Sequence, residues 1–219
     1  MRSRFDEQLA LLKRELIEMG ALCEEVIAAA AKALMEGDTE LAAQIPPRAS
    51  GIDQQERDIE ALCLKLLLRQ QPVASDLRQI SAALKMITDM ERIGDQAADI
   101  AEIIPFFLSH HTFDCTLVCR MAQQASSMVT QSVDAFVRRD VYLARSVAGQ
   151  DDLVDEDFTA VKQALIAAIA REPGQGEVAL DLLMIAKYFE RIGDHAVNLS
   201  EWVEFSVTGV HKHDGVEYE

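Results

Sequence analysis

The pentapeptide Glu91-Arg92-Ile93-Gly94-Asp95 recurs as Glu190-Arg191-Ile192-Gly193-Asp194, 99 residues further along the chain. Each copy lies near the end of its half of the 219-residue sequence. A chain of this length can hold two subdomains of about 100 residues each. The repeat therefore predicts two copies of one module, at residues 1–110 and 111–208, followed by a polar C-terminal tail at 209–219.

The composition is typical of a protein built from long helices. Hydrophobic residues make up 49% of the chain, but aromatic residues make up only 5%. The residue types that dominate, such as Ala, Leu, Met, Glu and Gln, favour helices over sheets. Apolar residues also recur every three or four positions, which is the spacing of an amphipathic helix. We therefore predict an all-α protein.

Six long helices follow from this spacing and from the turn residues that interrupt it. Pro47 is expected to begin the second helix, because the first helical position has no hydrogen bond to lose. Ser75 is expected to cap the third. The predicted helices cover residues 3–37, 47–70, 75 to 105 or slightly beyond, 114–139, 141–171 and 176–207. Because short connections make neighbouring helices pack antiparallel, we expect two tandem, pseudo-symmetric, antiparallel three-helix bundles.

Charge and hydropathy exclude several classes of protein. The formal net charge of -16 disfavours binding to nucleic acid or to an anionic lipid surface, and it suits a cation or a basic protein partner. The sequence has no run of 18 apolar residues and begins with the polar segment 1–6, so neither membrane insertion nor a signal peptide is expected. We expect a cytoplasmic protein whose four cysteines are reduced and buried.

Carboxylates gather on the two repeated motifs and on the middle helix of each half. Residues four apart on a helix share a face, so the repeats place acids in stripes that repel one another unless a cation lies among them. The second stripe has Asn198 where the first has an acid. The candidate metal ligands are Asp53, Glu56, Glu91, Asp95 and Asp99 in the first half and Asp151, Asp155, Glu190 and Asp194 in the second.

Several carboxylates with few histidines nearby form a hard-oxygen site, which suits magnesium, manganese, calcium or ferric iron better than zinc or copper. The alternative is that these acids are solvated surface charges in a purely structural helical protein. A nucleophile with a paired base, a glycine-rich phosphate loop and a redox cysteine pair are all absent from the sequence, so catalysis is not indicated. A carboxylate-bridged di-metal oxidase or storage bundle is a second hypothesis.

Three further features of the motifs carry expectations. Gly94 and Gly193 lie inside helices, where glycine costs roughly 0.5–1 kcal/mol relative to alanine, and so predict a close helix crossing or a ligand shell. Arg92 and Arg191 are expected to pair with acids of a neighbouring helix. His195 occurs in only one copy and is interpreted as a packing or capping residue.

The segments Arg69–Arg78, Asp89–Asp95 and Phe189–Asn198 resemble the PhoU family in order and spacing, and the similarity covers essentially the whole chain. The resemblance implies two three-helix bundles and a cytosolic, non-enzymatic accessory protein. Such a protein acts as a negative regulator that represses the phosphate-starvation response, and phosphate uptake with it, when phosphate is plentiful.

The family also implies partners and metals. The expected partners are a second copy in a homodimer, the ATPase subunit of a phosphate ABC transporter and a membrane sensor histidine kinase, which would recruit the protein to the inner face of the membrane. Metal clusters of some family members carry over by position to the acids named above, with iron, manganese, magnesium and zinc all open. Asn198, and Ala49 one turn before Asp53, depart from the family pattern.

Overall fold

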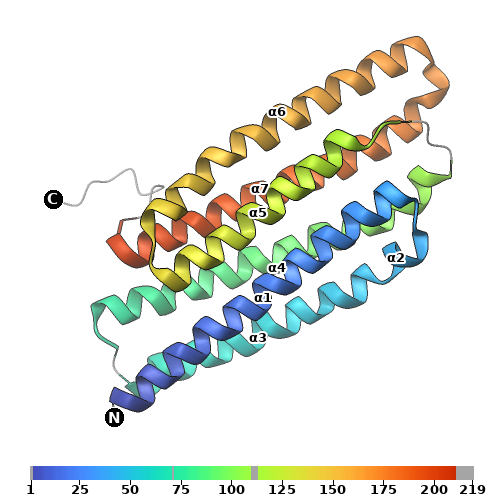
Figure 1. Ribbon diagram of the computed structural model, residues 1–219. Helices are drawn as coiled ribbons and strands as arrows, with labels where there is room; N and C mark the ends of the chain where they lie inside the picture. The colour runs from blue at the N-terminus through green and yellow to red at the C-terminus, as the bar shows by residue number, and fades with distance from the viewer. Residues whose placement is uncertain (1, 71, 110–112, 211–219) are drawn as a thin grey trace.

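The computed structural model describes residues 2–70, 72–109 and 113–210, and every regular element within these ranges is helical (Figure 1). The long helices are α1 (Arg2–Glu36), α3 (Ile45–Gln70), α4 (Ala74–Leu108), α5 (Thr116–Arg138), α6 (Val141–Arg171) and α7 (Gly176–Thr208). Two short elements, α2 (Thr39–Ala43) and the 3-10 helix η1 (Pro173–Gln175), lie in connections. The prediction of an all-α protein is confirmed.

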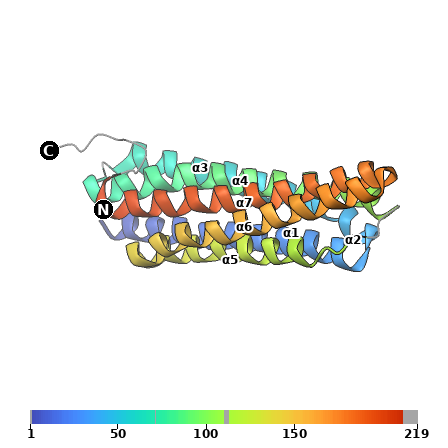
Figure 2. The ribbon, with the colours of Figure 1, turned by 90° about the horizontal axis from the view of Figure 1, so that it is seen from above.

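The long helices form the two predicted three-helix bundles. Helices α1, α3 and α4 pack together, and so do α5, α6 and α7. The bundles join where α4 packs along α7 and α1 along α5, which gives an elongated body (Figures 1 and 2). One continuous core of buried residues runs through both halves. The expected boundary at 110/111 and most of the tail, residues 211–219, lie outside the described residues, so these divisions stay predictions.

The two bundles are related by an approximate two-fold rotation. On α4 and α7, Asp89 contacts Asn198, while Asp99 lies beside Tyr188. In the repeat, which is offset by 99 residues, Tyr188 is the equivalent of Asp89 and Asn198 is the equivalent of Asp99. Both contacts therefore join the same two equivalent positions, once in each direction. This is the isologous pairing of a symmetric dimer, here contained within one chain.

Three helix boundaries differ from the prediction. Helix α3 begins at Ile45, so Pro46 and Pro47 both lie in its first turn, where a missing N–H leaves no bond unmade. The cap predicted at Ser75 is wrong, because α4 already begins after Val73, whose extended backbone supplies no side-chain cap. Helix α5 begins at Thr116, whose backbone N–H donates to Asp114 Oδ1 at 2.9 Å.

The four cysteines are buried and free, as predicted: Cys23, Cys63, Cys115 and Cys119. Burial raises the pKa of Cys23 and Cys63 to about 12, which keeps both thiols protonated and unreactive. They act as small core residues. In the described part of the chain, no helix is both long and apolar enough to span a bilayer.

Candidate metal centre

The first half brings three of the predicted ligands together between α3 and α4. Asp53 on α3 and Glu91 and Asp95 on α4 each offer a carboxylate oxygen, and these oxygens all lie within 4.8 Å of one another. The three side chains are partly buried. Glu56, one turn after Asp53, is near enough for its charge to act on Glu91. This set of oxygen donors fits a hard divalent or trivalent cation.

The electrostatics of this cluster show strain between like charges. Burial, followed by the neighbouring charge of Asp95, raises the pKa of Glu91 above its usual value. Burial also raises the pKa of Glu56, with further contributions from Glu60 and Asp53. Both shifts mean that the ionised cluster is less stable than separate carboxylates in water would be. A bound cation would relieve this repulsion.

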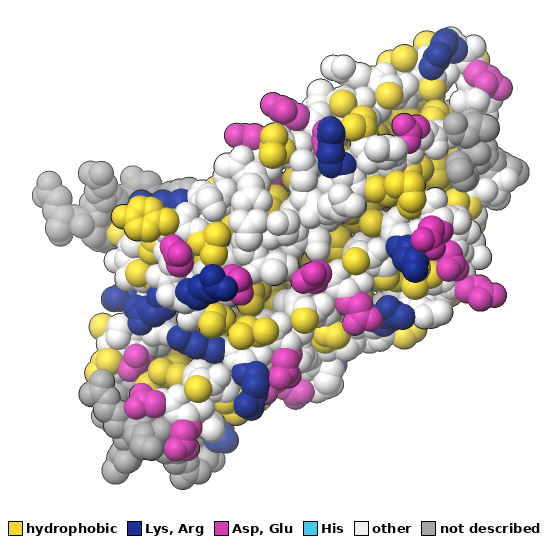
Figure 3. All heavy atoms as spheres, in the orientation of Figure 1, with side chains coloured by type: hydrophobic (Ala, Val, Ile, Leu, Met, Phe, Trp, Pro, Cys, Tyr) yellow, Lys and Arg dark blue, Asp and Glu magenta, His cyan; other side chains and the backbone are white. Residues whose placement is uncertain are grey.

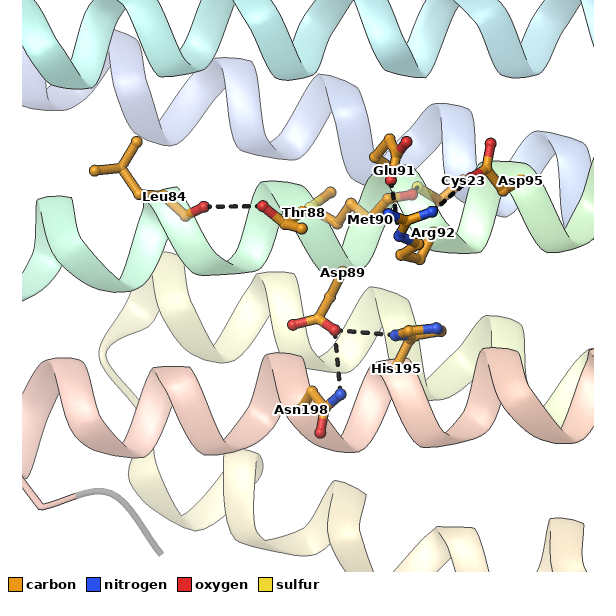
Figure 4. A network of polar contacts seen from close by, with 10 residues as sticks. All are labelled: Cys23, Leu84, Thr88, Asp89, Met90, Glu91, Arg92, Asp95, His195 and Asn198. Carbon is orange, nitrogen blue, oxygen red and sulfur yellow. Dashed lines mark hydrogen bonds and ion pairs between the residues drawn. The ribbon is translucent and has the colours of Figure 1, made fainter. Parts of the chain in front are cut away.

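Arg92 supplies part of the missing positive charge. Its Nε lies 3.4 Å from Glu91 Oε2, and its Nη1 lies 3.3 Å from Asp95 Oδ2 (Figure 4). Both ion pairs lie within α4, and the charge of Arg92 also acts on Glu56 of the neighbouring helix α3, where it opposes the rise in the pKa of that acid. The long, flexible side chain bends along its own helix to reach residues one and three positions away.

Asp99 lies apart from this trio. Its carboxylate faces the second bundle, where burial and then the charge of Asp99 raise the pKa of Tyr188. Each step of four residues turns 40° around the helix, so Asp99 has rotated well away from Glu91. Glu91 and Asp95 therefore share a face of α4, whereas Asp99, four residues further on, lies at its edge.

The second half also gathers its predicted acids, between α6 and α7. Burial raises the pKa of Asp151 to about 6, and the charges of Asp194, Asp155 and Glu190 add to the shift. Asp151 Oδ1 is buried and has no hydrogen-bond partner among the described residues. A buried, unpartnered carboxylate oxygen aimed into an acidic cluster fits a missing donor or cation.

The second cluster differs from the first in that it contains a lysine. Lys187 Nζ forms a short ion pair with Glu190 Oε2 and lies 5.4 Å from the centroid of the Phe158 ring. The Lys187 charge also opposes the rise in the pKa of Asp194, which burial causes. In the described part of the second half, no three acids bring carboxylate oxygens within 4.8 Å of one another, as Asp53, Glu91 and Asp95 do in the first. The ammonium group thus supplies positive charge to Glu190 and Asp194.

The two motif glycines allow different close approaches. A β-carbon built on Gly94 would lie 3.0 Å from Ile52 Cδ1, whereas one built on Gly193 would lie 3.0 Å from Asp151 Oδ1. The prediction of a close helix crossing is confirmed for both. Ile52 and Asp151 are equivalent after the shift of 99 residues. The same contact is therefore apolar in the first bundle and carries a carboxylate in the second.

A polar bridge joins the two bundles beside the first cluster. Asp89 Oδ1 lies 3.0 Å from His195 Nδ1 and accepts a hydrogen bond of 3.1 Å from Asn198 Nδ2 (Figure 4). His195, interpreted as a packing or capping residue, instead makes a polar contact with an acid of the other half. Sequence reasoning missed Lys187 and the roles of Asp89 and Asn198. The spacing of three between Lys187 and Glu190 was a usable signal, but nothing in the sequence pairs Asp89 with α7.

The arrangement matches that of known proteins along most of the chain. The PhoU domain model matches residues 16–104 and, a second time, residues 118–203. The chain belongs to the PhoU family. A phosphate-specific transport system accessory protein PhoU homolog from Pseudomonas putida is 36% identical over 208 residues, which cover 94% of this chain and 81% of that protein. A PhoU homolog from Clostridium acetobutylicum is 33% identical, over 95% and 96% of the two chains.

Solved PhoU structures share the fold. The crystal structure of PhoU from Pseudomonas aeruginosa is 34% identical and superposes with a TM-score of 0.89, over 94% of this chain and all of that one. The phosphate transport system regulatory protein PhoU from Streptococcus pneumoniae is 27% identical, with a TM-score of 0.87 over 94% and 98% of the two chains. The names of these relatives describe accessory and regulatory proteins of phosphate transport.

Proposed function

We propose that this chain is a cytoplasmic, non-enzymatic adaptor that represses the phosphate-starvation response and limits phosphate uptake when phosphate is plentiful. In this role it contacts the ATPase subunit of a phosphate ABC transporter and the cytoplasmic part of a sensor histidine kinase. Those contacts recruit it to the inner face of the membrane. It acts as a homodimer.

One observation carries this proposal. The PhoU domain occurs twice and lies in both halves of the chain. The relatives that align with 94% of the chain are named as accessory proteins of phosphate-specific transport. Function is inferred here at the level of the family, since the fold alone supports many activities. The acidic surface of the chain, with its net charge of -16, suits contacts with proteins rather than with nucleic acid.

Metal binding is the second part of the proposal. Asp53, Glu91 and Asp95 would hold a cation in the first bundle, and Glu56 would extend the site. In the second bundle the ligands would be Asp151, Asp155, Glu190 and Asp194, in competition with Lys187. A cation in either cluster would tie two helices of one bundle together. Its role is to stabilise the bundle and to shape the surface that partners meet.

A reporter of phosphate starvation tests the adaptor role. Secreted phosphatase activity is measured in cells that lack this gene and grow in abundant phosphate. We expect high activity, returned to the wild-type level by the intact gene. Unchanged activity in the deletion strain would refute the proposed regulation and direct attention to metal content and oxygen chemistry.

A further inference from the structure

The side of the molecule formed by α1 and α5 is close to neutral. Helix α1 holds five basic and seven acidic residues, and α5 holds two basic residues and one acidic residue, so together they carry -1 of the chain's -16. Helices α4 and α7 hold five basic and twelve acidic residues and carry -7. Figures 1 and 2 show α1 and α5 on one side of the body and α4 and α7 on the other. The negative charge is therefore concentrated away from α1 and α5.

Ion pairs compensate many of the charges that α1 and α5 do carry. Some pairs run along one helix, and others reach a neighbouring helix of the same bundle. They are Arg14–Glu18 and Lys32–Glu36 on α1, Arg138–Asp134 on α5, Arg48–Glu25 between α3 and α1, and Arg120–Asp157 between α5 and α6. A molecule that approaches this side therefore meets little net charge.

A hollow of about 370 Å³ lies in the middle of this side, between α1 and α5. Figure 3 looks onto this side, and uncharged side chains make up most of its middle. Glu24 is the one charged residue among the described residues that line the hollow. Small side chains leave the space open: Ala28 and Ala31 on α1, and Ala122, Ser126 and Ser127 on α5.

Polar side chains of the hollow already have partners within the chain. Thr130 Oγ1 donates to Glu24 Oε2 at 3.1 Å, and Gln131 Nε2 donates to Ser127 Oγ at 2.8 Å. The main cost of covering polar groups comes from donors and acceptors that lose their partners. Because these groups keep theirs, another protein surface can cover the hollow at low cost.

Exposed apolar side chains flank the hollow on α1. Ile17 is 46% exposed and Met35 is 54% exposed. Ile17, Ala28 and Met35 follow one another at intervals of 11 and 7 residues, so they lie on nearly the same face of the helix. We call the surface from Ile17 to Met35 on α1 and from Gln123 to Gln131 on α5 the α1–α5 face.

We propose that two copies of this chain pair through the α1–α5 face. The inference rests on the proposed homodimer and names its surface. A second copy also carries -16, so like charges repel it from the side of α4 and α7, and the nearly neutral α1–α5 face is where it can approach closely. A basic partner protein would instead be drawn to the side that carries -7.

The shape and size of the face suit a two-fold pair. In such a pair the same patch serves both copies, so a projecting Ile17 or Met35 of one copy can fill the hollow of the other, and symmetry repeats the contact. Helix α5, with 23 residues, is about 35 Å long, and two helices side by side are about 20 Å wide. This area is close to the roughly 800 Å² that each partner buries in a specific complex.

Analytical ultracentrifugation of the full chain tests the surface. We expect the wild type to reach twice the chain mass of 24.3 kDa. Ala28→Glu with Ser127→Glu places a carboxylate on each side of the hollow, at positions equivalent in the repeat, and should raise the Kd of the dimer at least tenfold. Ala61→Glu with Ala160→Glu, also exposed and equivalent to each other, adds the same charge on α3 and α6 and should change the Kd less than twofold. Equal Tm values would show that both variants fold.

Photocrosslinking gives a test that leaves the charge unchanged. A photoreactive amino acid at Ala28 should join two copies, whereas the same group at Ala160 should not. A wild type that stays monomeric would refute the proposed homodimer, and the inference with it. A dimer that does not crosslink from Ala28, or that both double variants weaken equally, would overturn the inference and leave the homodimer in place. If Ala28→Glu with Ser127→Glu kept the dimer but raised the secreted phosphatase activity of cells in abundant phosphate, another protein would be the occupant, and the inference would again be wrong.

Discussion

Asn198 Nδ2 donates to Asp89 Oδ1 at 3.1 Å across the contact between the two bundles. By internal symmetry Asn198 occupies the position of Asp99, and so the sequence suggests a lost metal ligand. In the structure Asn198 instead forms a hydrogen bond with Asp89 of the other bundle. An aspartate there would face another carboxylate. The asparagine therefore belongs to the joint between the bundles rather than to an incomplete metal site.

Replacing this asparagine by an acid should weaken the joint. At pH 7 we expect Asn198→Asp to lower the free energy of unfolding by about 1–3 kcal/mol, because it exchanges a hydrogen bond for repulsion between two partly buried carboxylates. Urea unfolding at pH 7 measures the loss.

Asn198→Ala is the matched control for that substitution. It removes the hydrogen bond without adding charge, so its cost at pH 7 should be only about 1 kcal/mol. If Asn198→Asp instead left stability unchanged and increased the metal content, the interpretation as a missing ligand would be the correct one.

Removing two acids of the trio in the first bundle should change stability relative to the wild type in opposite directions without and with metal. Glu91→Ala with Asp95→Ala should remove bound manganese, measured by elemental analysis after dialysis. In EDTA the variant should be at least as stable as the wild type, since the repulsion that contributes to the raised pKa of Glu91 is gone. With excess manganese it should be less stable, since the wild type alone gains binding energy.

Asp58→Ala with Glu40→Ala removes the same charge from exposed positions of α3 and α2 and serves as the control. It should keep the manganese of the wild type. Equal metal content in both double variants would show that Glu91 and Asp95 are not ligands.

The sequence predicted the helices well because their signals are local. Apolar spacing and turn residues fixed the six long helices, and errors such as the cap at Ser75 amount to one or two residues at an end. The acids were assigned by two rules: neighbours on one helix and symmetry between halves. Asp53, Glu91 and Asp95 meet as those rules require. Asp99 and Asn198 do not, because their partners depend on how α4 packs on α7.

Lys187 should act as a tethered cation in the second cluster. Without it, Glu190 loses its ion-pair partner, so Lys187→Met should lower the Tm in EDTA by roughly 2–4 °C, equivalent to about 1 kcal/mol for this half-exposed lysine. The rise in Tm on adding manganese should become larger than in the wild type, because the second cluster now lacks its internal counter-charge.

Lys162→Met separates this effect from simple loss of a lysine. Lys162 Nζ also lies over the Phe158 ring, at 5.9 Å from its centroid, but it has no acid partner among the described residues. Its replacement should leave the manganese response as in the wild type. An equal response in all three proteins would mean that Lys187 does not compete with metal.

Asp151 predicts how stability depends on pH in the metal-free protein. Its pKa rises from 3.8 to about 6 on folding, mainly through burial, so the folded state holds this proton more tightly than the unfolded state does. The resulting stabilisation is fully present below about pH 4 and is lost as the pH rises through 6. At pH 7.5 the ionised, buried carboxylate is a burden on the fold.

Asp151→Asn should therefore raise the free energy of unfolding at pH 7.5 by about 1 kcal/mol in EDTA, a value kept low because the site reaches solvent. Below pH 4 the variant and the wild type should unfold at the same urea concentration, since neither side chain is then charged. Asp152→Asn, at an exposed neighbouring position, should gain much less at pH 7.5. A gain from Asp151→Asn that stayed constant from pH 4 to 7.5 would show that packing, not charge burial, limits stability at this carboxylate.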